Sequence, residues 1–287
     1  MKVSIFTVEH RNGYKINWSN QQIDMVVDMY LNQGMSTTKI GEKFSVGNGT
    51  IRKLIEANGH KTRTLHDQRI IYSRDSYYFQ EINTEEKAYW LGFLYADANI
   101  NEKENKVRLG LSSIDEDHLT KFKNSLKSNA PIKHSEKTVG EKTYFTSFVS
   151  IADNIMIKDL IKQGCTAKKS FTLQFPNSSI VPEKLLSHFI RGYFDGDGSI
   201  NKSQPYKNTK RDEYRISFIG TLNFLENIKN LLNCNHLKLE DKNTHFCLQI
   251  NGNLQVLNIL ENIVYKDATI YLTRKFNKFL DLKSMYK

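Results

Sequence analysis

Apolar residues recur with helical spacing in two segments of the chain, and both segments end in the same way. Residues 88–100, AYWLGFLYADANI, and residues 188–200, HFIRGYFDGDGSI, each place a glycine five positions before an aspartate. Apolar or small residues at i, i+3, i+4 and i+7 give each segment one continuous helical face. The pattern therefore predicts two equivalent helices, one in each of two related parts of the chain.

The internal repeat continues beyond these two segments. Alternating positions predict strands and longer periodic stretches predict helices, in the same order in both copies. The corresponding segments are 107–113, 118–127, 144–151 and 154–163 in the first copy, and 215–221, 224–233, 245–251 and 253–263 in the second. A basic segment closes each copy, at 166–175 and 269–279. The predicted fold class is α+β, with two pseudo-symmetric αββαββα repeats.

A small helical unit is predicted ahead of the repeats. Residues 3–18 suggest a short hairpin, Ser19 and Ser36 are suited to cap two helices, and a third helix follows in NGTIRKLIEA. Two short helices joined by a tight turn resemble a helix-turn-helix. The predicted domains are 1–60 for this unit, 61–85 for a basic and aromatic linker, 86–182 for the first repeat and 183–287 for the second.

Composition narrows the class of partner. Forty-one Lys and Arg against 31 Asp and Glu give a net charge of +10, which favours a polyanionic partner such as DNA. Three cysteines without a CxxC pair indicate free buried thiols in a reducing compartment rather than a zinc site. No stretch approaches the ~20 apolar residues of a membrane span, and the first residues lack the apolar run of a signal peptide. We therefore expect a cytoplasmic, DNA-associated protein.

The two aspartates, Asp97 and Asp197, stand where stability alone would not place them. Small residues four apart allow the two helices to approach closely, so both carboxylates should emerge together at the C-terminal ends of the pair. The helix dipole disfavours an anion there, and two neighbouring carboxylates repel each other. Because both copies place an acid at this unfavourable position, the two acids indicate a function rather than a contribution to stability. Mg²⁺, or Mn²⁺, would relieve the repulsion and suits phosphodiester hydrolysis.

These segments resemble the two motifs of the LAGLIDADG homing endonucleases, with WLGFLYADA at 90–98 and IRGYFDGDG at 190–198. In that family the eighth motif position is the metal-binding acid, and it falls on Asp97 and Asp197. The sixth position, usually acidic, is Tyr95 in the first copy, and the ninth, usually glycine, is Ala98. These departures put equal strength of the two half-sites in doubt and make strand-biased nicking conceivable.

The resemblance implies a monomer in which two curved sheets form a saddle over double-stranded DNA, cut across the minor groove with short 3′ overhangs. It implies that the carbonyls of Ala96 and Gly196 help to hold the metal. It also implies a basic residue near each reacting phosphate, for which we expect Lys169 and Lys275.

Further DNA contacts are expected from outward-facing polar and basic residues. They are Thr50, Arg52 and Lys53 in the helical unit, Arg108, Ser112, Arg215 and Ser217 on strands, Lys202, Lys207 and Arg211 near the longer turn of the second repeat, and Lys168 and Arg274 beside the two lysines. Which face of a strand a residue occupies depends on its register.

The sequence thus predicts a site-specific homing endonuclease of a mobile element or phage that makes double-strand breaks. Two alternatives stay open, a non-catalytic DNA-binding transcriptional regulator and an RNA maturase that assists intron splicing. Retention of both acidic residues favours the nuclease over the regulator. An intein is disfavoured because the chain starts with Met1 and lacks a terminal His-Asn pair.

Overall fold

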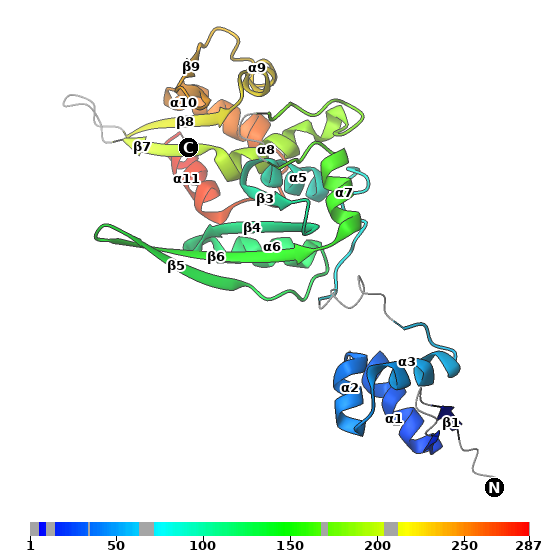
Figure 1. The fold of residues 1–287 in the computed structure, drawn as a ribbon. Coiled ribbons are helices and arrows are strands. Elements are labelled where there is room, and N and C mark those ends of the chain that lie inside the picture. Colours follow the sequence, from blue (N-terminus) through cyan, green and yellow to red (C-terminus); the bar gives the residue numbers. More distant parts are fainter. Residues whose placement is uncertain are drawn as a thin grey trace. The chain divides into compact units, whose positions relative to one another are not determined.

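The computed structural model describes residues 6–9, 15–33, 35–62, 72–167, 172–203 and 212–286. Lys168, Lys169, Lys207 and Arg211, four of the residues predicted to contact DNA or take part in catalysis, lie outside these ranges. The chain divides into two units, Met1–Ile71 and Tyr72–Lys287 (Figure 1).

The first unit contains a hairpin and three helices. Strand β1 (Phe6–Glu9) pairs antiparallel with β2 (Lys15–Trp18), and the helices are α1 (Asn20–Leu31), α2 (Thr37–Phe44) and α3 (Asn48–Ala57). The Ser19 and Ser36 side chains accept hydrogen bonds from Gln22 N and Lys39 N, as their sequence positions predict. The three predicted helices are therefore confirmed.

The turn between α2 and α3 is tight. Ser45 adopts a left-handed conformation with φ of 54°, and a Cβ on Gly41 would lie 2.5 Å from the Val46 carbonyl oxygen. The prediction that Thr50 faces outward is wrong, because Thr50 is one turn before Leu54 and shares its buried side of α3. Arg52 and Lys53 are exposed, as predicted.

The second unit holds the two repeats, in identical element order. The first repeat has α5 (Glu85–Asp97), β3 (Ala98–Asn101), β4 (Lys106–Ser112), α6 (Glu116–Ser125), β5 (Lys133–Val139), β6 (Lys142–Ala152) and α7 (Asn154–Lys162). The second has α8 (Leu186–Asp197), β7 (Ser199–Ser203), β8 (Glu213–Gly220), α9 (Leu222–Leu231), β9 (Leu239–Asp241), β10 (Phe246–Asn251) and α10 (Asn253–Ile259). A final helix, α11 (Thr273–Ser284), follows.

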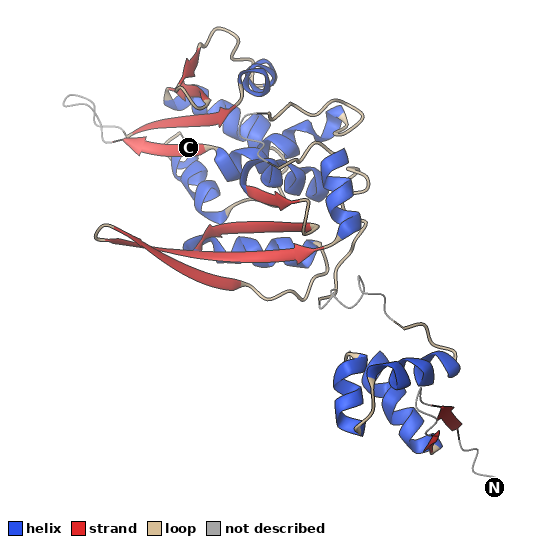
Figure 2. Cartoon of the chain, viewed as in Figure 1, coloured by secondary structure: helices blue, strands red, loops and turns tan. Residues whose placement is uncertain are grey.

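The two antiparallel sheets have the same topology. Their strand orders are β3-β4-β6-β5 and β7-β8-β10-β9, which confirms the predicted pair of αββαββα repeats. One face of each sheet packs on helices and the other faces outward (Figure 2). In β4, Val107, Leu109 and Leu111 alternate towards the helices, and Ile216 and Phe218 do the same in β8.

The second unit has one continuous hydrophobic core that includes both central helices. Cys165 and Cys234 are buried and Cys247 is partly buried, and all three are free thiols, as predicted. In the part of the chain that the structure describes, no helix is both long enough and apolar enough to cross a membrane.

Candidate active site

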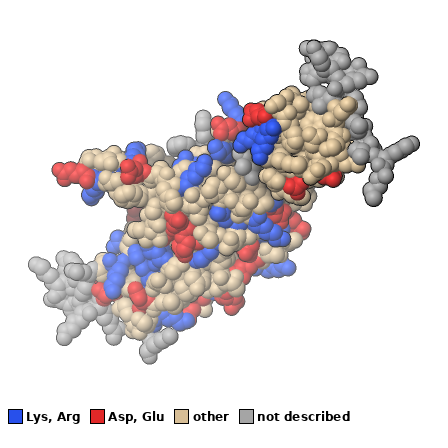
Figure 3. All heavy atoms as spheres, turned by 90° about the horizontal axis from the view of Figure 1, so that it is seen from below, with Lys and Arg blue, Asp and Glu red and all other residues tan. Residues whose placement is uncertain are grey.

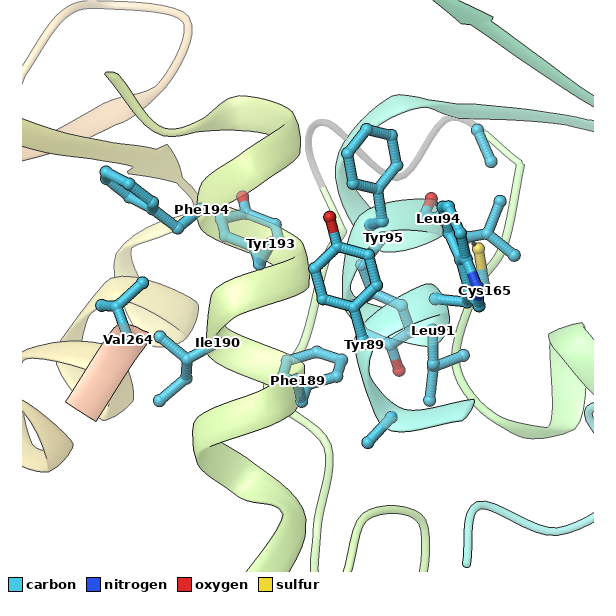
Figure 4. Packing of buried hydrophobic residues seen from close by; sticks show 14 of the residues in the cluster. Tyr89, Leu91, Leu94, Tyr95, Cys165, Phe189, Ile190, Tyr193, Phe194 and Val264 are labelled. Carbon is cyan, nitrogen blue, oxygen red and sulfur yellow. Dashed lines mark hydrogen bonds between the residues drawn. The ribbon is translucent and has the colours of Figure 1, made fainter. Parts of the chain in front are cut away.

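Helices α5 and α8 pack against each other through their backbones. A Cβ on Gly92 would lie 2.0 Å from the carbonyl oxygen of Phe189, and a Cβ on Gly192 would lie 1.9 Å from that of Tyr89. The two contacts are equivalent under exchange of the repeats. Figure 4 shows the Tyr89 and Phe189 side chains lying between the helices.

The aspartates are the last residues of these helices, Asp97 in α5 and Asp197 in α8. The helix ends meet, because a Cβ on Gly196 would lie 2.3 Å from the Ala96 Cβ and 3.3 Å from Asp97 Oδ2. Asp97 is half-buried and Asp197 is exposed. Burial raises the pKa of Tyr193 far above its usual range, and the charges of both aspartates add to that shift. The structure therefore places the two predicted acids close enough for both charges to act on Tyr193.

A cavity of about 260 Å³ opens beside this neighbourhood. Ala96, Tyr193, Asp197, Thr221 and His245 are among the residues that line it. Tyr193 and His245 were not singled out from the sequence. Tyr193 lies within the second motif, but no sequence signal connects His245 to it, because the bend before β10 that carries His245 is brought close only by the fold.

Lys275 is buried against the end of α8. Its Nζ donates to the carbonyl oxygens of Phe194 at 2.6 Å, Asp195 at 2.7 Å, Gly196 at 3.2 Å and Gly198 at 2.5 Å. Burial lowers the pKa of Lys275 to about 8, against the opposing charges of nearby aspartates. A cation at this position offsets the partial negative charge of the helix end. Lys275 therefore positions the end of the second motif, and its predicted catalytic role stays a prediction.

The sixth motif position is Tyr95 in the first repeat and Asp195 in the second, and both side chains make hydrogen bonds that hold the central helices. Asp195 is buried and accepts hydrogen bonds from Tyr89 Oη at 2.8 Å, Tyr265 Oη at 3.0 Å and Leu272 N at 2.7 Å. Burial raises the pKa of its carboxyl group. In the first motif the Tyr95 hydroxyl donates to the Gln163 carbonyl at the end of α7. Each residue thus ties the later part of its own repeat to the central helices.

Two short polar contacts also join side chains of α5 and α8. One is the hydrogen bond from Tyr89 to Asp195, and the other is an ion pair of 2.7 Å between Glu85 and Arg191 Nη2. The Arg191 side chain is fully buried and also donates to the Ile270 carbonyl. Both contacts therefore fix α5 against α8 in addition to the glycine packing.

The oxygen donors at the helix ends suit a hard divalent cation. Over the residues whose placement is described, no cluster of three or more His, Cys, Asp or Glu side chains could hold a metal by itself. Of the two predicted carbonyl ligands, that of Gly196 also accepts from Lys275.

The strand register settles the face of four predicted DNA-binding residues. Arg108, Ser112, Arg215 and Ser217 alternate with the buried residues of β4 and β8, so all four face outward. Two other predicted DNA-binding residues, Lys202 and Arg274, form ion pairs within the protein. Lys202 Nζ lies 2.7 Å from Asp212 Oδ2, and Arg274 Nη2 lies 3.0 Å from Asp115 Oδ2.

Two αββαββα repeats with an acid at the end of each central helix are the arrangement that the motif resemblance predicts. Residues 190–286 match the family model described as LAGLIDADG endonuclease. This match covers the second motif and most of the second repeat, and it confirms the resemblance predicted from the motifs.

Individual relatives are more distant. An uncharacterized protein of Methanocaldococcus jannaschii is 26% identical over 162 residues, which are 54% of this chain and 57% of that protein. The chain thus spans little more than half the length of this relative.

Similar solved structures include the meganuclease I-SmaMI bound to uncleaveable DNA, with a TM-score of 0.46 and 13% identity over 69% of this chain and 89% of that one. They also include the homing endonuclease I-LtrWI bound to target DNA, with a TM-score of 0.45 and 14% identity over 71% of this chain and 90% of that one. The function proposed below rests on the family model and on the site itself.

Proposed function

We propose that this chain is a site-specific, metal-dependent DNA endonuclease that makes double-strand breaks with short 3′ overhangs. The observation that carries the proposal is the meeting of Asp97 and Asp197 at the ends of two helices in backbone contact. One acid from each repeat provides one site for each DNA strand. The match of the second repeat to an endonuclease family supports the same reaction class.

Asp97 and Asp197 would hold Mg²⁺ or Mn²⁺, with the Ala96 and Gly196 carbonyls as further donors. Such an ion would lower the pKa of a water molecule and stabilise charge on the leaving oxygen. The chain itself contributes the fixed separation of the two acids. Lys275 contributes a buried positive charge that holds the end of α8 and partly offsets the repulsion between the acids.

Double-stranded DNA is the substrate best suited to the charge and the outward sheet faces. The chain has a net charge of +10, and Lys106 and Arg215 occupy equivalent outward positions in the two repeats, opposite Asn101 and Asn201. The first unit would add contacts outside the cleaved core through the exposed Arg52 and Lys53 of α3.

The first test is incubation of the full chain with a pooled DNA library, with Mg²⁺ or with EDTA, followed by sequencing of new ends. Mg²⁺-dependent ends at one long sequence with short 3′ overhangs would support the proposal. Specific binding without new ends would instead favour a transcriptional regulator, and the absence of both binding and cutting would turn attention to RNA.

Once a site is found, Asp97→Asn and Asp197→Asn should each abolish double-strand cutting and leave DNA affinity within a few-fold of the parent. Asp241→Asn, on the exposed strand β9, is the matched control and should cut normally. Full cleavage by either motif variant would disprove the assignment of both acids.

Removal of residues 1–71, the whole first unit, tests its role. We expect weaker binding of the target with a smaller effect on the rate of the cleavage step. A truncated chain with unaltered affinity would show that α1–α3 do not contact this DNA.

A further inference from the structure

Basic residues are distributed unequally between the outward faces of the two sheets. In the first sheet, the residues that alternate with the buried positions include five cations and no acid on its four strands. These cations are Lys106, Arg108, Lys133, Lys137 and Lys142. Their strand partners on this face are neutral, and they include Ser150 opposite Arg108 and Phe148 opposite Lys133.

The outward face of the second sheet differs in charge. Along its described strand residues it carries one cation, Arg215, and two acids, Glu213 and Glu240. The remaining outward residues are neutral, such as Ser217 opposite Gln249 and Asn201 opposite Arg215. Figure 3 shows basic and acidic side chains interspersed over one side of the molecule. The net charge of the molecule therefore does not show which surface binds a polyanion. The strand register does, because it shows which cations lie on the same face of a sheet.

The first sheet also has an extension at β5 and β6 without a counterpart in the described strands β9 and β10. Beyond the pairing of Ser112 with Thr146, strands β5 and β6 continue as a two-stranded ribbon up to the pairing of Val139 with Lys142. This ribbon runs out past the rest of the sheet (Figure 1). The corresponding strand β9 has only three residues. A two-stranded antiparallel ribbon is narrow enough to enter the DNA major groove.

The ribbon is exposed and its outward side is basic. Lys137 and Tyr144 pair on that side, whereas Glu136 pairs with Phe145 on the opposite side. Tyr144 is 55% exposed and Phe145 is 59% exposed, so the ribbon presents one aromatic ring on each of its two sides. At the base of the ribbon, the Arg108 guanidinium lies 3.6 Å from the centre of the Phe148 ring, which holds this cation on the outward face.

We infer that the outward face of the first sheet and its β5–β6 ribbon form the principal phosphate-binding surface among the described strands of the two-repeat unit. The second sheet contributes little electrostatic binding through its strands. This inference rests on the proposed function, because it takes DNA as the polyanion. The two halves of a target are thus held unequally, with the first repeat as the electrostatic anchor.

The test is the salt dependence of binding to a fluorescent 40-base-pair duplex of arbitrary sequence, in EDTA, with the full chain. Each phosphate contact contributes about 0.9 to the slope of log K against log[KCl]. The variant Lys133→Gln/Lys137→Gln/Lys142→Gln should reduce the magnitude of the slope by about 2.5. Arg215→Gln should reduce it by about 1 or less.

A control with the same change of charge is Lys127→Gln/Lys158→Gln/Lys266→Gln, at three exposed lysines away from the outward faces. It should keep the slope of the parent chain. A steep slope in the parent, with equal slopes in the ribbon variant and the control, would overturn the inference and leave the nuclease proposal intact. A flat salt response in the parent chain would overturn both.

Discussion

The Tyr89 hydroxyl donates a hydrogen bond of 2.8 Å to Asp195, and His118 Nε2 lies 2.9 Å from the same hydroxyl oxygen. Because this hydroxyl gives its only proton to Asp195, His118 donates from Nε2. Its Nδ1 is buried without a hydrogen-bond partner in the described part of the protein. Burial lowers the pKa of His118 to about 3, so the ring is neutral in the folded protein.

His118 should therefore make the protein less stable in mild acid. Below its unfolded pKa of about 6.5 the unfolded chain takes up a proton that the folded chain does not, so stability falls as the pH falls from about 6.5 towards 3. Between pH 7 and pH 5, His118 should lower the free energy of unfolding by about 2 kcal/mol. Urea unfolding of the parent and of His118→Gln at both pH values measures the difference. An equal loss of stability in both proteins would contradict the prediction.

The backbone contact between α5 and α8 should not tolerate a methyl group. Gly92→Ala and Gly192→Ala should each cost more than about 3 kcal/mol, because the added Cβ would overlap a carbonyl oxygen and the helix must move as a whole. Gly110→Ala is the control, since its Cβ would meet Phe148 at an ordinary 3.5 Å. Denaturation midpoints provide the measurement. A midpoint close to that of the parent in either helix variant would show that this contact does not hold the two helices together.

Lys275 should contribute to folding as well as to activity. Lys275→Met removes the donor from four carbonyl oxygens at the end of α8 and should cost about 3 kcal/mol or more. Lys278→Met, three residues further along α11, removes one hydrogen bond to the Ile200 carbonyl and should cost about 1 kcal/mol. The two are compared by thermal unfolding. A purely catalytic lysine would leave the unfolding of the Lys275 variant unchanged.

Tyr95 should replace the family's usual acid in its structural role, without impairing cleavage of either DNA strand. Tyr95→Phe loses the hydrogen bond to Gln163 and should cost about 1 kcal/mol, with both DNA strands still cut. Tyr95→Asp restores the usual residue, but it would place a carboxylate beside the Phe189 and Phe224 rings and should be more destabilising. The ratio of nicked to linear plasmid reports on strand bias. Predominant nicking by Tyr95→Phe would show that its hydroxyl serves the reaction.

The elements of the repeat were predictable where one face of an element is buried. The strands around Leu109 and Ile216 show the expected alternation, and the central helices show their apolar faces. Strand β5 was not predicted because all seven of its residues are exposed, so it has no alternation to detect. Helix α11 was read only as a basic segment, because Lys and Arg obscure the helical spacing of Phe279 and Leu282.

The acids of the candidate site were predictable because they break an electrostatic rule in both copies. The environment of Lys275 was not, since a lysine is rarely buried and nothing in its neighbourhood marks it as a helix cap. Thr50 was misplaced because it stands beside two basic residues in sequence but one turn from Leu54 in the helix. Strand register decided the positions of Arg108 and Arg215, and the sequence left that register open.

The two short polar contacts between α5 and α8 have a consequence for exchanging halves between proteins built from two such repeats. Glu85 meets Arg191, and Tyr89 meets Asp195, whereas the repeat-equivalent residues of Glu85 and Tyr89 are Leu185 and Phe189. A symmetric dimer of the second repeat would thus leave its buried arginine and aspartate facing apolar side chains. The halves are complementary rather than interchangeable, so a chimera that takes one half from another chain must carry both partners of each contact with it.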